Sequence, residues 1–357
     1  MDLLRALIVV SEKAANVARI CRQDKHLFEL LVQKKKASEA NPRFVDDFKT
    51  LADVLIQEMV KHDIGNKFPG LANDIRGEEN NVFCNKLGES INVQVMNSVA
   101  ETSNLLQKVL NGDEHAANLL ATEVHREIKM QDVDTELPIK NFDVDINNVG
   151  IWIDPIDCTG EYINGVDSEF ENGLYLSGLR CVTVLIGAYN KETQLPIMGI
   201  INQPFVEEKS SRWKGRCIWG VATGNHTSTS QKSHIPRHHI LCLSSTESIE
   251  VKIKLQENGF KLAEASGAGY KILSVILGLA DAYILSRSST YKWDTCAPHA
   301  ILKSLGGDIF IYEEALQNKM TPIKYPPEAE GSKYSNCGGL IAYKDPEVLS
   351  EVLSCLI

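Results

Sequence analysis

The sequence predicts a mixed α/β protein built in two parts: an N-terminal α+β part over residues 1–230 and a smaller C-terminal α/β part over residues 231–357. The first observation is that apolar side chains recur at helical spacing over residues 2–36. The second is a succession of strand-like apolar runs at residues 181–189, 196–201 and 213–221. The third is a change after a polar stretch at 223–239, beyond which strand and helix patterns alternate as in an α/β domain.

Helical patterns dominate the start of the N-terminal part. Residues 2–36 predict two helices, and Asn41-Pro42 predicts a turn. Asp46 or Asp47 is expected to cap the next helix, whose apolar face comprises Phe48, Leu51, Leu55, Ile56 and Met59. Two more helices are predicted at 101–110 and 113–129, and an apolar alternation at 142–146 predicts a short strand.

Strand patterns dominate the middle of the chain and alternate with helices after it. The apolar residues 151–153 predict a strand that ends near Pro155, because proline cannot donate a ladder hydrogen bond. Residues 164–178 predict an exposed loop, and 190–195 a hairpin turn. In the C-terminal part the predicted strands lie at 240–243, 281–285, 308–312 and 338–343, and the predicted helices at 246–258, 272–279, 299–305 and 346–356.

The bulk composition excludes several classes of protein. A hydrophobic content of 43% and a charged content of 24% are those of an ordinary globular chain. The net charge of −10 argues against a nucleic-acid partner, and no apolar run is long enough to cross a membrane. The nine cysteines form no CxxC pair, which disfavours a zinc or disulfide framework and favours a cytoplasmic location. The N-terminal pattern is interpreted as an amphipathic helix rather than a signal peptide.

The stretch that carries most chemistry is Ile151–Thr159, in which Asp154 and Asp157 follow an apolar strand pattern. In α/β folds, ligands bind beyond the ends of strands. Two carboxylates this close repel each other and raise one pKa unless a cation lies between them. The stretch therefore predicts a site for a hard metal ion with oxygen ligands.

Four other acids are candidates, each with a purely structural alternative. Asp53 lies in a predicted helix, where a solvent-facing acid is the commoner role. Glu78 and Glu79 would ordinarily face solvent, but Gly77 before them could let the backbone bend both toward one ion. Asp294 precedes an apolar helix pattern, so it could be a helix N-cap.

Two other motifs favour no site. The polar stretch at 223–239 holds four histidines, but their irregular spacing and the lack of a nearby Cys or Asp disfavour a metal site. The run Gly267-Ala268-Gly269 does not match the GxGxxG pattern of dinucleotide-binding proteins.

Taken together, these acids resemble a known family. The segments WIDPIDCT (152–159) and KWDTCAPHAIL (292–302), with Gly-Glu-Glu upstream, are similar to the signatures of the lithium-sensitive, magnesium-dependent phosphomonoesterases. These include inositol monophosphatase and fructose 1,6-bisphosphatase, and the resemblance covers nearly the whole chain. It implies their layered αβαβα sandwich.

The resemblance also implies roles for individual residues. It implies two or three Mg²⁺ ions per site and Li⁺ as an inhibitor, with the metal set comprising Asp53, Glu78, Glu79, Asp154, the Ile156 carbonyl, Asp157 and Asp294. Thr159, oriented by Asp53, would relay a proton from the attacking water, and Glu78 would act through a metal-bound water. The substrate would contact Asp157, Cys158, Thr159, Thr246, Ser248, Gly267 and Lys271. Cys158 stands where the family more often has Ser or Gly, and Ser248 stands where a basic residue is expected.

Within the family, runs such as FKTLADVLIQE (48–58) and SGLRCVTVLIGAYN (177–190) are most similar to the members that act on inositol polyphosphates. The expected activity is removal of the 1-phosphate from inositol 1,4-bisphosphate and inositol 1,3,4-trisphosphate by in-line attack of a metal-activated water. The alternatives are a 3′(2′),5′-bisphosphate nucleotidase and a non-catalytic inositol-phosphate-binding protein. A monomer is expected.

Overall fold

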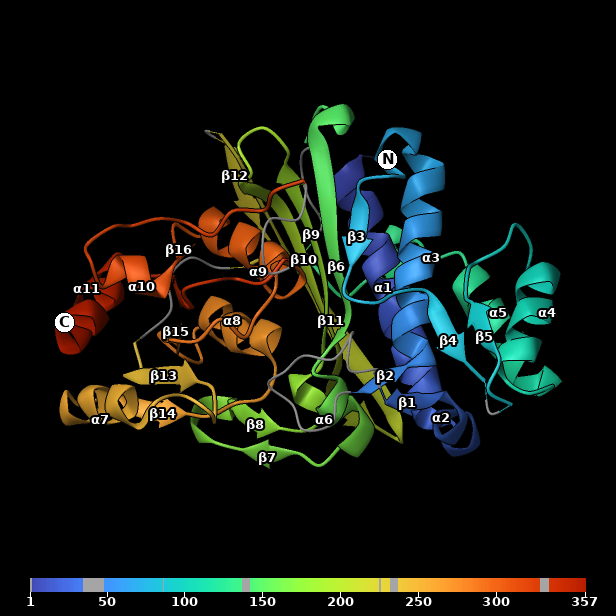
Figure 1. The fold of residues 1–357 in the computed structure, drawn as a ribbon, viewed down its shortest axis with the longest axis horizontal. Coiled ribbons are helices and arrows are strands. Elements are labelled where there is room, and N and C mark those ends of the chain that lie inside the picture. The colour runs from blue at the N-terminus through green and yellow to red at the C-terminus, as the bar shows by residue number, and fades with distance from the viewer. Residues whose placement is uncertain are drawn as a thin grey trace.

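The computed structural model describes residues 2–34, 48–85, 87–136, 142–224, 226–231, 237–327 and 334–357. Helices and sheets alternate in five layers, which confirms the predicted αβαβα sandwich (Figure 1). The first layer contains α1 (Leu3–Gln23) and α3 (Leu51–Lys67), which pack on a six-stranded sheet. On the other face of that sheet lie α8 (Ala268–Leu277) and α9 (Lys292–Ser304), and they separate it from a five-stranded sheet. The outer layer is α7 (Ile249–Glu257) and α11 (Pro346–Leu356).

The large sheet has the order β12-β11-β10-β9-β6-β3, and all its pairs are antiparallel except β3 with β6. Its strands are β3 (Ile75–Gly77), β6 (Val149–Asp157), β9 (Thr183–Asn190), β10 (Pro196–Lys209), β11 (Arg212–Thr223) and β12 (His226–Thr229). The strand β6 is buried along its whole length, because helices cover both faces of the sheet.

The second sheet has the order β14-β13-β15-β17-β16 and mixes parallel with antiparallel pairs. Its strands are β13 (Ile240–Leu243), β14 (Lys261–Ala263), β15 (Ala282–Leu285), β16 (Asp308–Phe310) and β17 (Leu340–Tyr343). The smaller elements are α2 (Lys25–Leu31), α4 (Val99–Val109), α5 (Glu114–His125), α6 (Thr159–Asn164), α10 (Tyr312–Ala315), β1 (Val32–Lys34), β2 (Phe48–Thr50), β4 (Val82–Cys84), β5 (Ser90–Asn92), β7 (Ser168–Glu169) and β8 (Tyr175–Ser177).

One apolar core lies between the two sheets and includes residues of α8 and α9, and it draws residues from both parts of the chain. Trp152, Leu185 and Tyr189 of the large sheet pack there with Cys242 and Tyr283 of the second sheet. A second core lies under α1 and α3, and a third lies under α7 and α11. The division of the chain at residue 230 stays a prediction.

Several predicted boundaries are wrong. The third helix begins at Leu51 and is capped by Thr50, whereas Phe48 lies in β2. The structure does not describe the predicted turn at Asn41-Pro42 or the predicted caps Asp46 and Asp47. Residues 142–145 form no strand: the apolar alternation is short, and no described strand pairs with this segment. The stretch 164–178 contains the β7–β8 pair, and 223–239 contains β12. The helix expected at 299–305 begins earlier, at Lys292.

Candidate active site

Three carboxylates from two distant segments meet at the end of β6. Asp154 and Asp157 lie on β6, and Asp294 lies in the first turn of α9. Each offers one oxygen, and these oxygens lie within 4.8 Å of one another. The residues are 1%, 7% and 9% exposed, respectively. Within the described part of the chain, this is the group of His, Cys, Asp and Glu side chains whose geometry fits a metal ion.

An irregularity in β6 brings its two acids together. In a regular strand, residues three apart point to opposite faces, so Asp154 and Asp157 would diverge. The register with β9 shifts between these residues, from Asp154 opposite Leu185 to Asp157 opposite Thr183. A bulge of this kind re-aims a side chain. The strand therefore continues past Pro155, contrary to the prediction, and the irregularity lies where proline removes a ladder donor.

The electrostatics of the three acids favour a bound cation. Burial, and then the charges of Glu78, Asp157 and Asp294, raise the pKa of Asp154 well above its usual range. Burial also raises the pKa of Asp294, with Asp157 and Glu78 adding to it. The Asp154 Oδ1 atom is buried and has no hydrogen-bond partner. A buried, unpartnered acceptor among carboxylates fits a hard cation such as Mg²⁺, which prefers oxygen ligands.

Asp157 is held from the other half of the molecule. Its Oδ2 accepts a hydrogen bond from the Gly269 N–H (2.8 Å), and the Thr183 hydroxyl donates to it (3.3 Å). Burial raises its pKa, while the charge of Lys271 and the Gly269 N–H oppose that rise. The first turn of α8 thus fixes one oxygen of Asp157.

Glu78 and Glu79 follow β3, next to β6. The Glu78 N–H donates to the Ile153 carbonyl (3.1 Å), and Glu79 is buried. Gln57 of α3 accepts from the Glu79 N–H (2.9 Å) and donates to the Glu79 carbonyl. Gly77 serves close packing rather than a sharp bend, since its φ is not positive and a Cβ there would collide with Gln57 and lie 2.9 Å from the Ile153 carbonyl.

Asp53 is buried at the start of α3, so it is no solvent-facing acid. Its Oδ2 accepts from both the N–H and the hydroxyl of Thr50, each at 2.6 Å. The Thr159 hydroxyl donates to the Ile156 carbonyl (3.1 Å). The two residues that were expected to form a relay therefore have other hydrogen-bond partners here, and the relay stays a prediction. Asp53 is near enough to the acids for its charge to raise the pKa of Asp154.

The residues expected to hold phosphate lie at two helix starts. Cys158 precedes α6 and adopts a left-handed conformation (φ 75°), which explains why glycine suits this position. Gly267 precedes α8 with φ 76°, and a Cβ there would lie 3.0 Å from Asp157 Oδ2. Thr159, the first residue of α6, follows Cys158 directly.

The other expected substrate residues lie around the second sheet. Thr246 is exposed, and its hydroxyl contacts Ser244 (3.0 Å). Ser248 caps α7 by accepting from the Val251 N–H (3.2 Å). Lys271 is buried, and its Nζ donates to the Ala265 carbonyl (2.9 Å). Its position supports Asp157 electrostatically, and direct contact with a substrate stays a prediction.

Several residues that were not predicted as part of the site hold its acids in place by hydrogen bonds. Thr50 holds Asp53, Gln57 holds Glu79, and Gly269 with Thr183 holds Asp157. The spacing of Thr50 and Asp53 is that of a capping box, which is a local signal. The other contacts join segments that are distant in sequence, and no local pattern indicates them.

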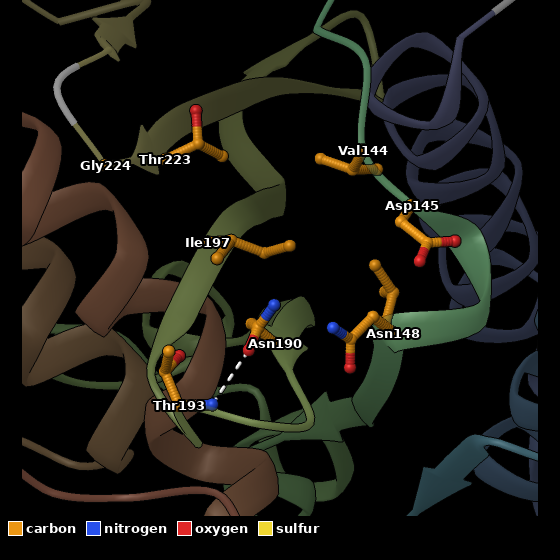
Figure 2. Close-up of a pocket in the computed structure, with 9 residues that line it drawn as sticks. Val144, Asp145, Asn148, Asn190, Thr193, Ile197, Thr223 and Gly224 are labelled. Carbon is orange, nitrogen blue, oxygen red and sulfur yellow. Dashed lines mark hydrogen bonds between the residues drawn. The ribbon is translucent and has the colours of Figure 1, made fainter.

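A cavity of about 300 Å³ lies away from the acids, near the start of β6 (Figure 2). Its lining includes Val144, Asn148 and Ile197, with the Thr193 N–H bonded to Asn190 Oδ1 (2.8 Å). Since Asp145 is its one acidic lining residue, this cavity lacks the carboxylate cluster that phosphate chemistry with a metal requires.

Comparison with known families matches residues 4–336 to the inositol monophosphatase family, and the chain belongs to that family. It is 43% identical to inositol polyphosphate 1-phosphatase of Mus musculus over 388 residues, which cover 100% of this chain and 97% of that protein. The Homo sapiens protein of that name is 42% identical, with the same coverage. The Mus musculus 3′(2′),5′-bisphosphate nucleotidase 1 is 28% identical, covering 96% and 90%.

Solved structures show the same fold. The extragenic suppressor protein SuhB from Bartonella henselae has a TM-score of 0.54 at 11% identity, covering 98% of this chain and 96% of that one. In addition, no helix among the described residues is long and apolar enough to cross a bilayer.

Proposed function

We propose that this chain is a metal-dependent phosphomonoesterase that removes the 1-phosphate from inositol 1,4-bisphosphate and inositol 1,3,4-trisphosphate. The observation that carries the proposal is the meeting of three buried carboxylates, one of which has an unpartnered oxygen. The full-length identity of 43% to an inositol polyphosphate 1-phosphatase supports the choice of substrate.

The chain offers carboxylate oxygens that suit Mg²⁺. Asp154, Asp157 and Asp294 would hold it directly, and Glu78, Glu79, Asp53 and the Ile156 carbonyl lie in the adjoining segments. Bound Mg²⁺ supplies charge neutralisation for the phosphate and lowers the pKa of a water. Li⁺, a small cation, is expected to compete for this donor set.

The chain's own groups would position the substrate and the proton. The N–H groups of Cys158 and Thr159, at the start of α6, would bind the scissile phosphate. The Thr159 hydroxyl would relay the water's proton, accepting it while passing its own proton to the Asp53 carboxylate that orients it. Gly267 lies close to Asp157 and Cys158. Thr246, Ser248, Gly267 and Lys271 would contact the inositol ring and its second phosphate.

A phosphate-release assay tests the proposal. The purified chain is given Mg²⁺ with either inositol 1,4-bisphosphate or adenosine 3′,5′-bisphosphate, and a parallel series contains Li⁺. Release from the inositol phosphate, abolished by Asp154→Asn and reduced by Li⁺, is the expected result. Release from the nucleotide alone would assign the nucleotidase activity instead. Binding of both compounds without release would indicate a non-catalytic binding protein.

A further inference from the structure

A line of buried polar side chains crosses the interior from the second sheet to α9. It starts at β16, passes through α9 and ends at the first turn of that helix; its members are Asp308, His299, Tyr325, Thr295 and Asn336. All but Asp308 are at most 1% exposed. The proposed reaction uses none of them, so their arrangement needs another explanation.

The line is continuous in hydrogen bonds from Asp308 to Thr295. His299 Nε2 lies 2.5 Å from Asp308 Oδ1, and His299 Nδ1 lies 2.9 Å from the Tyr325 hydroxyl. The Tyr325 hydroxyl donates to Thr295 Oγ1 (3.2 Å). Although burial alone would raise the pKa of Asp308, the hydrogen bond of His299 lowers it, while burial lowers the pKa of His299, so a carboxylate hydrogen-bonded to Nε2 anchors the ring.

The line ends on Tyr291, the residue whose N–H bonds Asp294. Asn336 Nδ2 donates to Thr295 Oγ1 (3.2 Å) and to the Tyr291 carbonyl (2.8 Å), and the Thr295 hydroxyl donates to the same carbonyl (3.2 Å). The Tyr291 N–H in turn donates to Asp294 Oδ2 (2.6 Å). Tyr291 therefore links the line to Asp294: Thr295 and Asn336 hold its carbonyl, and its N–H holds Asp294 Oδ2.

The first turn of α9 has a specific need for this support. Pro298 lies inside the helix and has no N–H, so the Asp294 carbonyl cannot receive the usual hydrogen bond from four residues ahead. A turn that lacks such a bond is easier to displace. The contacts of Thr295 and Asn336 with Tyr291 replace part of that restraint from outside the helix.

We propose that His299, Tyr325 and Thr295 are positioning residues for Asp294, which hold its carboxylate toward Asp154 and Asp157 so that the three can share one metal ion. The inference rests on the proposed function, and it assigns the line a role beyond the stability of the core. None of the three residues touches a reacting atom. Partners that orient metal ligands typically change metal affinity or activity by about 10- to 100-fold when they are removed.

The test measures the Mg²⁺ concentration that gives half of the maximal rise in melting temperature, which needs no substrate. Tyr325→Phe and Thr295→Val remove single hydroxyls at nearly constant volume, and each is expected to raise this concentration about tenfold. The double variant is expected to add little, because both changes interrupt the same line. Thr295→Ser keeps the hydroxyl and should restore an almost normal value. Tyr312→Phe, a buried tyrosine of α10, is the matched control and should change nothing.

Phosphate release gives a second readout. In Tyr325→Phe, the Mg²⁺ requirement for turnover should rise while KM for inositol 1,4-bisphosphate stays the same. A Mg²⁺ midpoint within twofold of that of the unaltered chain in Tyr325→Phe would overturn the inference, as would an equal shift in Thr295→Ser and Thr295→Val. If Thr295→Val does not fold, Tyr325→Phe decides alone.

The failure of the proposed function is distinguishable from the failure of this inference. An unaltered chain that is stabilised by Mg²⁺ but releases no phosphate contradicts the proposed function, and the Mg²⁺ midpoints of the variants still decide the positioning role. An unaltered chain with no Mg²⁺-dependent stabilisation overturns the positioning role together with the metal assignment.

Discussion

Replacement of Gly269 by alanine tests whether α8 positions a metal ligand. Gly269 lies in the first turn of α8 with an ordinary helical backbone, so alanine is compatible with its conformation. The surroundings leave no room: a Cβ would lie 2.6 Å from Leu185 Cδ1 and 2.8 Å from both Asp157 Oδ2 and Thr183 Oγ1. The carboxylate and the helix must therefore move apart.

The magnitude follows from opposing effects. Alanine in place of glycine favours a helix by about 1 kcal/mol. Overpacking of a dense interior costs about 1–3 kcal/mol. A weakened hydrogen bond from the Gly269 N–H to the Asp157 carboxylate adds about 1.5–3 kcal/mol. The free energy of unfolding should therefore fall by about 1.5–5 kcal/mol. The Mg²⁺ affinity should fall by about tenfold, because Asp157 loses the partner that orients it.

Thermal unfolding with and without Mg²⁺ measures both quantities. Gly65→Ala is the matched control, because Gly65 lies within α3 and a Cβ there would make only ordinary contact with Ala72 at 3.4 Å. That variant should become more stable by up to about 1 kcal/mol and keep its Mg²⁺ midpoint. The reasoning is refuted if Gly269→Ala is as stable as Gly65→Ala, or if it binds Mg²⁺ as tightly as the unaltered chain.

Three further predictions concern single side chains. Asp53→Asn keeps an acceptor for the two Thr50 donors, so the fold and the KM for substrate should persist. The kcat should fall about 100-fold or more, which steady-state kinetics would measure. Near-normal turnover would remove Asp53 from the mechanism. Asp154→Asn relieves charge repulsion at a buried site, so the melting temperature measured without Mg²⁺ should increase. The stabilisation that Mg²⁺ gives to the unaltered chain should be absent from this variant. If Mg²⁺ still stabilises the variant, the metal assignment is contradicted. Burial raises the pKa of Glu123 in the folded chain, so its favourable contribution is complete below the unfolded value of about 4.3 and is lost as pH rises through the folded value. Glu123→Gln should therefore raise the melting temperature at pH 8 but hardly at pH 4, and equal effects at both would show that titration of Glu123 is not the cause.

Much of the fold was predictable because its signals are local. The strand patterns at 181–189, 196–201 and 240–243 correspond to β9, the first part of β10, and β13. The predicted ends of strands were wrong where tertiary contacts outweighed the local strand propensity. The strand β10 runs on to Lys209 because β11 pairs with it, and β6 passes Pro155 through a shift in its register with β9.

The candidate site was predictable in its members but not in its arrangement. Asp154 and Asp157 stand out because acids are rare beside so apolar a run, and Asp294 stands out by its place in the segment KWDTCAPHAIL. The partners that orient them do not stand out. Gly269 and Thr183 hold Asp157 from segments 112 and 26 residues away, so no short window of sequence contains the interaction.

The sequence by itself determined the family, the layered class of fold and which acids are candidate metal ligands, because short motifs and apolar periodicity record local chemistry. Only the tertiary structure decided that Asp154, Asp157 and Asp294 share one buried place, and that a proline-interrupted helix holds the third through His299, Tyr325 and Thr295. The physical reason is that burial, charge repulsion and orientation depend on which distant segments come together. Those quantities exist only after the chain has folded.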